Sequence, residues 1–366
     1  MKQFGFGTMR LPTTEDGAID QAQVCEMIDQ FLARGYTYFD TAYPYHKGKA
    51  ELAVRECLVK RHPRDAFLLA DKLPPWNIRT ESDLEPIFQK QLNKCGVTYF
   101  DYYLLHNLSA DNAVVFDNCN AFEFLKKVKA DGRAKQVGFS FHDKPELLEQ
   151  LLAAHPDVDF VQLQINCLDW ENPTVQARRC YEIARRYDKP IIVMEPLKGG
   201  GLANLPPAAA AELNALPHPQ SSICYALRYC AQLPGVMMIL SGMSTPEQMA
   251  ENLDIMDTCQ PLNPTEQAAL ERAVLAMQKS GAIPCTACHY CAESCPKHIA
   301  IAEVFSAYNN FKQFGEVNFP TMFYTVYTKN RGKASDCIAC GACKTHCPQH
   351  LEIPKLMKDV AAQFEA

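Results

Sequence analysis

The sequence predicts an α/β fold in which a closed, eight-stranded parallel barrel is followed by a small, mainly helical domain. Eight short apolar stretches with strand character recur as far as Gly242, and segments with helical character separate them. After Gly281 the chain becomes rich in cysteine and aromatic residues, which indicates a change of domain. We therefore expect the barrel over residues 1–280 and a second domain over residues 281–366.

The expected strands are apolar runs, several of which end in polar residues. They are Phe4–Leu11, Tyr36–Thr41, Ala66–Leu73, Tyr99–Asn107, Lys135–Phe141, Asp159–Asn166, Pro190–Leu197 and Val236–Gly242. Strand and helix repeated eight times over about 255 residues match a (β/α)₈ TIM barrel in count and length. A doubly wound open sheet is the alternative, and the even spacing of the units favours the barrel.

Start signals mark several of the helices. Gln21–Leu32 is amphipathic, Thr80–Glu85 has the pattern of a capped helix start, and Ser244–Glu247 places an N-cap before a proline. One more helix is expected over Asn263–Lys279, and Ile301–Tyr327 is mostly helical in character.

Charge and hydropathy argue against several classes of partner. The formal net charge of −6 gives no electrostatic reason to expect nucleic acid or an anionic membrane surface. The longest apolar runs are short and interrupted by polar residues, so none is expected to span a bilayer. The first residues lack the apolar core of a signal peptide.

The chain has seventeen cysteines, a high number. A secreted disulfide scaffold would be a short chain, whereas this one is long and alternates strands with helices. Nine cysteines are scattered and are interpreted as reduced, mostly buried small hydrophobes: Cys25, Cys57, Cys95, Cys119, Cys167, Cys180, Cys224, Cys230 and Cys259. The other eight form two compact arrays, interpreted as metal ligands. Both patterns favour a reducing, cytoplasmic location.

Both arrays have the pattern C-x₂-C-x₂-C-x₃-C-P, which is typical of 4Fe–4S sites. The first three cysteines of such an array hold one cluster, and the fourth reaches the other cluster. We therefore assign Cys285, Cys288, Cys291 and Cys347 to one 4Fe–4S cluster, and Cys337, Cys340, Cys343 and Cys295 to the other. Structural zinc sites are the alternative, but they usually need only two C-x₂-C pairs and no trailing proline.

The arrays resemble those of bacterial dicluster ferredoxins. The long, helical-looking segment between them is similar to the α-helical variety of that group. His289 and His346 lie inside the arrays and are expected to be surface or outer groups, not ligands. Because each array lends a cysteine to the other cluster, we do not expect this domain to fold without iron.

Four polar side chains follow three consecutive strands: Asp40 and Tyr45, Lys72, and His106. The carboxyl ends of barrel strands converge on one face, where catalytic groups lie. A tyrosine can donate a proton when a nearby ammonium group favours its phenolate, so Lys72 is expected to acidify Tyr45. Asp40 would hold Lys72, and His106 would polarise a carbonyl oxygen. Each residue alone could be structural, but four at three successive strand ends favour catalysis.

At these residues the sequence resembles the aldo/keto reductase family. Phe39–Tyr45, Lys72 and Leu104–His106 fall where that family carries its catalytic tetrad, and Gly48–Glu51 is similar to the start of its following helix. The resemblance covers about residues 1–280. It implies reduction of a small-molecule aldehyde or ketone by a nicotinamide cofactor bound across the barrel mouth.

The resemblance also implies contacts with the nicotinamide ring. Ser140 matches the serine that holds the carboxamide, and Gln162 matches the glutamine at the same group, with Gln164 as a fallback. Met194 occupies the place of an aromatic residue that stacks under the ring. Trp76 is a candidate wall of the substrate pocket, as is Trp170.

For the rest of the cofactor, the segment with Leu197 and Gly199 resembles the family's phosphate loop. After the eighth strand, Gly242 and Gln248 occupy the places where the family keeps cations for the 2′-phosphate of NADPH, and Glu251 and Asn252 match its adenine contacts. Without those cations, NADPH loses charge-assisted bonds. NADPH is therefore not expected to be strongly preferred, and NADH is expected to serve at least as well.

The sequence leaves undecided whether electrons pass between the two domains, because hydride transfer moves two electrons whereas a cluster moves one. A flavin or a redox partner would be needed to split them, and no flavin motif is visible. One hypothesis is a carbonyl reductase whose clusters exchange electrons with a ferredoxin-like or flavodoxin-like partner, or only stabilise the domain. The other is an iron–sulfur electron-transfer protein whose barrel docks or senses. The intact quartet of residues favours the first.

Overall fold

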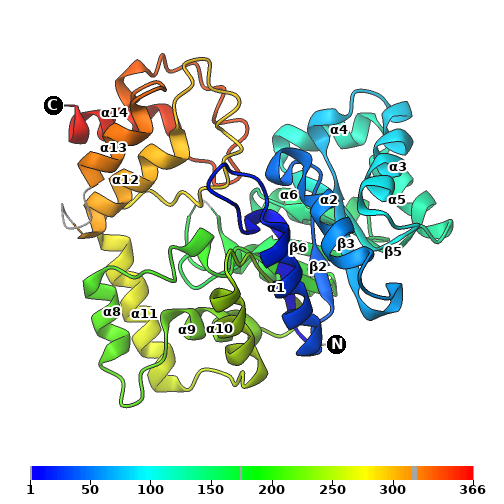
Figure 1. The fold of residues 1–366 in the computed structure, drawn as a ribbon, viewed down its shortest axis with the longest axis horizontal. Helices are drawn as coiled ribbons and strands as arrows, with labels where there is room; N and C mark the ends of the chain where they lie inside the picture. Colours follow the sequence, from blue (N-terminus) through cyan, green and yellow to red (C-terminus); the bar gives the residue numbers. More distant parts are fainter. Residues whose placement is uncertain (1, 174, 315–319, 366) are drawn as a thin grey trace. The chain divides into compact units, whose positions relative to one another are not determined.

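The computed structural model describes residues 2–173, 175–314 and 320–365. The chain divides into two compact units, and each contains two stretches of sequence. The barrel unit contains Met1–Pro196 and Leu227–Pro261, and the cysteine unit contains Leu197–Ala226 and Leu262–Ala366. Figure 1 shows the ribbon coloured along the sequence.

The barrel unit is built on a closed sheet of eight parallel strands in sequential order, so the predicted (β/α)₈ barrel is confirmed. The strands are β1 (Phe4–Gly7), β2 (Tyr38–Asp40), β3 (Leu68–Leu73), β4 (Phe100–Leu108), β5 (Ala134–Phe141), β6 (Phe160–Gln164), β7 (Ile191–Met194) and β8 (Val236–Ser241). Each lies within the predicted run or extends it by one residue. Pairing of β1 with β8 closes the barrel.

Helices and strands alternate in this unit as predicted. The helices are α1 (Gln21–Ala33), α2 (Ala50–Val54), α3 (Leu84–Cys95), α4 (Ala110–Asn118), α5 (Ala121–Ala130), α6 (Pro145–Ala154), α7 (Ala177–Arg186) and α10 (Pro246–Asp257), while α9 (Ser222–Ala231) crosses from one unit to the other. Thr245 caps α10 by accepting from the backbone N–H of Gln248. The proline after it suits the first helical turn, where no backbone donor is needed.

Aromatic side chains fill the centre of the barrel. The rings of Tyr38 and Tyr102 lie 4.9 Å apart between centroids, and Tyr102 meets Phe160 edge-on at 5.4 Å. Glycines provide room beside them. A β-carbon on Gly138 would lie 2.3 Å from the backbone oxygen of Phe160, a distance that no side-chain rotation can relieve. Gly138 therefore lets β5 and β6 pair while the Phe160 ring fills the barrel.

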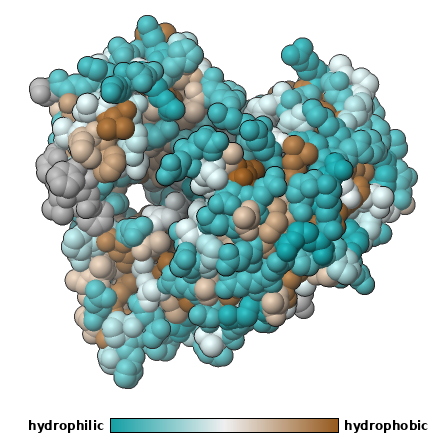
Figure 2. Space-filling model, viewed as in Figure 1, coloured by the Kyte–Doolittle hydropathy of each residue, from teal (hydrophilic) through white to brown (hydrophobic). Residues whose placement is uncertain are grey.

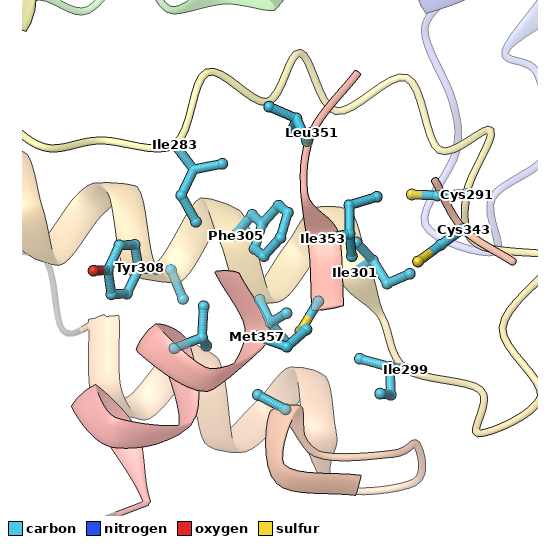
Figure 3. Close-up of a cluster of buried hydrophobic side chains, with 14 of the residues drawn as sticks. Ile283, Cys291, Ile299, Ile301, Phe305, Tyr308, Cys343, Leu351, Ile353 and Met357 are labelled. Carbon is cyan, nitrogen blue, oxygen red and sulfur yellow. The ribbon is translucent and has the colours of Figure 1, made fainter. Parts of the chain in front are cut away.

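The cysteine unit is mainly helical, as predicted. Its helices are α8 (Pro207–Asn214), α11 (Pro264–Lys279), α12 (Ile301–Phe314), α13 (Pro320–Thr328) and α14 (Ile353–Phe364). Its core includes Phe305, Ile353, Met357 and two array cysteines, Cys291 and Cys343 (Figure 3). Each cysteine array therefore contributes one buried cysteine to the hydrophobic core of this unit.

None of the helices in the described part of the chain has the length and apolar character needed to cross a membrane. On the face seen in Figure 2, hydrophilic residues predominate and hydrophobic ones lie in small groups.

Replacement of Gly138 by alanine should destabilise the barrel by about 1–3 kcal/mol, because the added methyl group overpacks a site bounded by backbone. Urea unfolding followed by tryptophan fluorescence measures this, because the two tryptophans of the chain, Trp76 and Trp170, both belong to the barrel unit.

Gly7→Ala is the matched control on another barrel strand. Its β-carbon would meet the nearest atom, the backbone oxygen of Ser241, at 3.5 Å, an ordinary contact. A Gly138→Ala protein as stable as Gly7→Ala would contradict the packing argument.

Candidate active site and cysteine sites

Lys72 is the centre of the candidate active site. It lies near the end of β3, and its side chain is 1 % exposed. The ammonium group donates to the carboxylate of Asp40, to the backbone oxygen of Thr41 at 2.8 Å and to the Tyr45 hydroxyl at 3.3 Å. The structure thus brings together three of the four residues that the sequence analysis selected, and a buried cation lies within hydrogen-bond distance of the phenol.

A tight turn after β2 places Tyr45. His46 and Lys47 both adopt left-handed backbone conformations, with φ of 50° and 56°. The His46 ring accepts a hydrogen bond from the backbone N–H of Leu11 at 3.2 Å, which holds the turn against the loop after β1. Non-glycine residues in this conformation carry a conformational cost, so surrounding contacts must hold the turn in place.

His106 lies near the end of β4 and faces Tyr45. The two rings are nearly perpendicular, with centroids 6.0 Å apart, and the Trp76 ring lies 5.4 Å from His106 on edge. Burial, then the charge of Lys72 and the neighbouring His142, hold the pKa of His106 well below its usual range. The ring is therefore neutral at pH 7, with one N–H to donate and one nitrogen to accept.

Asp40 is buried beside Lys72. Burial raises the pKa of Asp40, and the Lys72 ammonium opposes that rise. Its second carboxylate oxygen, Oδ2, has no hydrogen-bond partner among the described residues. The aspartate therefore directs its charge to Lys72 and fixes the amine by an ion pair inside the barrel.

A buried polar layer on the other face of β3 was missed by the sequence analysis. The Asp71 carboxylate accepts from the backbone N–H of Lys72 at 2.8 Å, and the Gln91 amide donates to the Lys72 carbonyl at 2.9 Å. Tyr103 donates to Gln91 at 2.7 Å, while Glu51 pairs with Lys94. These contacts fix the backbone that carries Lys72. An acidic residue inside an apolar strand was the one available signal.

Ser140 and Gln162 are register partners on β5 and β6, and both are buried. The Ser140 oxygen accepts from the backbone N–H of Asn107 at 2.7 Å. Gln162 donates to the Met194 sulfur at 3.7 Å, and its carbonyl oxygen has no partner within the described ranges. Gln164 instead donates to Asp169 at 2.7 Å. The geometry thus favours Gln162 over its fallback as the residue with spare hydrogen-bonding capacity.

The residues predicted after β8 are partly used in local structure. The Gln248 side chain accepts from the backbone N–H of Ser244 at 2.8 Å, and the Asn252 amide donates to the Ser241 hydroxyl at 3.0 Å. Glu251 is exposed. Gly242 packs against the aliphatic part of Arg10, since a β-carbon on this glycine would lie 3.3 Å from three carbons of that side chain. No sequence motif singles out Arg10.

Leu197 and Gly199 belong to the cysteine unit. Gly199 adopts a φ of +64°, and a β-carbon there would lie 2.5 Å from the backbone oxygen of Thr286. The Leu197 carbonyl accepts from the backbone N–H groups of Gly200 and Leu202. This loop, which resembles a phosphate loop in sequence, therefore packs against the first cysteine array.

Two cavities in the cysteine unit are each lined by four cysteines. We call them site 1, lined by Cys285, Cys288, Cys291 and Cys347, and site 2, lined by Cys295, Cys337, Cys340 and Cys343. These are the two sets that the spacing rule selects, each with a fourth cysteine from the other array. Four thiols with apolar walls such as Ile301 and Ile353 suit a cluster better than a hydrated ion.

The two arrays share one backbone pattern. Ala287 and Ala339 occupy equivalent places, and so do His289 and Gly341; all four have left-handed φ angles between 50° and 78°. Later in each copy, the backbone N–H of His298 or His350 donates to the carbonyl of the fourth cysteine at 3.0 Å. The second array therefore repeats the first in conformation as well as in sequence.

The remaining cysteines agree with the prediction that they are reduced. None of the seventeen forms a disulfide, and all lie within the described residues. Seven of the nine outside the arrays are buried. His289 is exposed, and its ring lies 3.8 Å from the Glu303 carboxylate, so its position agrees with a surface role.

Comparisons with known proteins agree with this architecture. Residues 3–274 match the aldo/keto reductase family, and residues 284–351 match the 4Fe-4S dicluster domain. An aldo-keto reductase of Mycolicibacterium smegmatis is 26 % identical over 242 residues, which cover 65 % of this chain and 78 % of that protein. One of Mycolicibacterium vanbaalenii is 24 % identical over 257 residues, covering 70 % and 85 %.

Solved structures show the same barrel. The holo form of an aldo-keto reductase from Bacillus halodurans superposes with a TM-score of 0.61 at 21 % identity, covering 74 % of this chain and 91 % of that one. An aldo-keto reductase from Klebsiella pneumoniae in complex with NADPH gives 0.58 at 21 % identity, covering 74 % and 90 %. With the match over residues 3–274, the chain belongs to the aldo/keto reductase family and carries a 4Fe-4S dicluster domain at its C-terminal end.

Proposed function

We propose that this oxidoreductase reduces a small aldehyde or ketone, or oxidises the corresponding alcohol, with Tyr45, Lys72, Asp40 and His106 as its catalytic residues. The observation that carries the proposal is the buried Lys72 ammonium, which lies 3.3 Å from the Tyr45 hydroxyl while Asp40 holds it from the other side. We also propose that two 4Fe–4S clusters serve electron exchange with a partner or a second cofactor.

A bound nicotinamide cofactor would supply hydride to the carbonyl carbon and would itself be oxidised to NAD(P)⁺. Tyr45 donates its hydroxyl proton to the carbonyl oxygen, which completes the alcohol. Lys72 stabilises the phenolate that this leaves, because an adjacent cation favours the charged form. His106 donates its N–H to the same oxygen as negative charge develops there. The neutral state of His106, which its burial favours, leaves the proton donation to Tyr45.

For the cofactor, we propose that Ser140 and Gln162 bind the nicotinamide carboxamide. The open carbonyl oxygen of Gln162 supports this, because a carboxamide N–H₂ would satisfy it. The other proposed contacts are Leu197, Gly199, Gly242, Gln248, Glu251 and Asn252. The side chains of Gln248 and Asn252 already make local hydrogen bonds, which leaves them fewer groups for a nucleotide.

For the clusters, we propose that the cysteines of site 1 and of site 2 hold one 4Fe–4S cluster each, as thiolates. Site 2 is the more accessible, since Cys340 is exposed and the Ile338 side chain beside it is 58 % exposed. An external one-electron carrier of the ferredoxin or flavodoxin type could therefore approach site 2. A flavin as the second cofactor is the other route, although the sequence has no flavin motif.

A second candidate function is an iron–sulfur electron-transfer protein whose barrel docks or senses. The accessible site 2 favours it. The arrangement around Lys72 favours the reductase, because a barrel that only docks or senses does not require a buried cation next to the Tyr45 hydroxyl.

Tyr45→Phe should lower NAD(P)H-dependent carbonyl reduction by about 10²–10⁴-fold, because it removes only the proton donor. Steady-state kinetics on a panel of aldehydes and ketones measures the loss, and the visible absorbance of the clusters should stay unchanged.

Tyr43→Phe is the control, since Tyr43 lies in the same turn and its hydroxyl accepts from Lys90 at 2.9 Å instead of Lys72. Equal activity of the Tyr45 and Tyr43 variants would contradict the catalytic assignment. Substrate-dependent oxidation of dithionite-reduced clusters without any nicotinamide would mean that the clusters, and not a nicotinamide, supply the reductant.

Titration with NADH and NADPH should give dissociation constants within tenfold of one another, because the segment after β8 offers Gly242 and Gln248 where cations would bind a 2′-phosphate. Quenching of protein fluorescence measures both constants. Tenfold tighter binding of NADPH would overturn this, and Arg10→Met would then test whether the arginine beside Gly242 supplies the missing charge.

The crossed ligand sets predict how paired cysteine variants behave. Cys285→Ser and Cys347→Ser both damage site 1, so the double variant should lose no more iron than either single variant. Iron analysis and EPR spectroscopy of the reduced protein measure the loss. Cys337→Ser combined with Cys347→Ser is the control, and it should lose both clusters. The reverse pattern would mean that each array holds its own cluster.

A further inference from the structure

Lys198 is a buried cation in the cysteine unit that neither the carbonyl chemistry nor the cysteine arrays use. It follows Leu197, is 4 % exposed, and has a left-handed φ of 49°. Its ammonium group donates to the side-chain carbonyl oxygen of Gln349 at 2.6 Å. Gln349, which is also 4 % exposed, lines site 1 together with Cys347. A contact between residues 151 positions apart thus places a cation beside site 1.

The loop that carries Lys198 has little freedom to move away. Gly199 packs against the backbone of Thr286, which also lines site 1, and any β-carbon at Gly199 would collide with it. The left-handed conformation of Gly199 suits a residue without a side chain. Lys198 therefore contacts Gln349, just after the second array, and the next residue, Gly199, contacts Thr286 in the first array. Both partners line site 1.

The lysine also fixes the orientation of the Gln349 amide. An ammonium group has only donors, so the amide must present its oxygen to Lys198. The N–H₂ group is then the branch of the amide that Lys198 does not bind, on a residue that lines site 1. The hydrogen bond to Gln349, which lines the site, thus places the positive charge beside a wall of site 1.

We infer that Lys198 is a positioning residue that, together with Gln349, raises the reduction potential of the cluster in site 1. A 4Fe–4S cluster with four thiolates is an anion and gains a further negative charge when it takes up an electron. A buried cation and an amide donor stabilise the reduced form more than the oxidised form. This inference rests on the proposed pair of clusters, but not on the proposed carbonyl chemistry.

Site 2 provides the contrast within the same molecule. The arrays repeat at a fixed offset, and the residue equivalent to Gln349 is Lys297, two positions after Cys295. Lys297 lines site 2 but is exposed to solvent. Water and salt screen an exposed charge far more than a buried one. The amine next to site 2 should therefore affect its cluster less than Lys198 affects the cluster in site 1.

The test is a redox titration of the full-length, iron-loaded protein, followed by EPR spectroscopy. Lys198→Met keeps the length of the side chain and removes the charge. It should make reduction of one cluster at least tenfold less favourable, a fall of 59 mV for one electron, and leave the other within threefold. Lys297→Met is the matched control and should change neither cluster by more than threefold.

Gln349→Met and Lys198→Arg complete the series. Gln349→Met should lower the potential of the same cluster as Lys198→Met, and Lys198→Arg should keep it near the wild-type value. Potentials unchanged within threefold in iron-loaded Lys198→Met, or an equal shift of both clusters, would overturn the inference. If Lys198→Met fails to bind iron at one site, an unchanged potential in Gln349→Met overturns it, and a lowered potential supports it.

Failure of this inference is distinct from failure of the proposed function. Wild-type protein that binds iron at only one site would refute the two-cluster proposal, and the inference would fall with it. If both clusters form normally and neither reduction potential changes when Lys198 is replaced, the inference alone is refuted.

Discussion

The ion pair between Lys72 and Asp40 is the interaction on which the candidate active site depends. A buried ammonium group is costly unless it is paired, and here a carboxylate and a backbone carbonyl both satisfy it. The barrel makes this possible because β2 and β3 are neighbours in parallel register, with Asp40 opposite Ala70. The lysine then has one direction left for its remaining donor, and Tyr45 lies in that direction.

The same barrel separates the residues that support Lys72 from the candidate catalytic residues. Gln91 and Tyr103, which support the backbone of Lys72, are joined by a hydrogen bond, and they hold β3 in place. Tyr45 follows β2, His106 lies near the end of β4, and Gln162 lies within β6, so the candidate residues come from different strands of one sheet.

Much of this could be predicted from the sequence, because the signals were local. Apolar runs predicted the strands, and N-caps and prolines predicted the helix starts. Polar residues at strand ends predicted the group formed by Asp40, Tyr45, Lys72 and His106. The cysteine spacing likewise selected the two sets of four that the structure brings together. Gln162 and Gln164 show the limit of local signals. Both point to one face of β6, and their partners distinguish them: Gln164 donates to Asp169 in the following loop, whereas Gln162 donates to the sulfur of Met194 on β7.

Contacts between remote segments were out of reach for the same reason. Neither Lys198 nor Gln349 belongs to a periodic pattern, and their separation along the chain hides the hydrogen bond between them. The polar layer with Asp71 was missed because burial of that face depends on the packing of α3. Arg10 lies against Gly242 only because β1 and β8 close the barrel.

The path of the chain limits how the protein can be divided into separate domains. The cysteine unit takes residues 197–226 before the barrel has received its eighth strand, and takes the rest afterwards. A fragment that begins near residue 281 would therefore lack the segment with Lys198, which belongs to the same unit as the cysteine arrays. The two units are interleaved, so neither can be exchanged as a simple cassette.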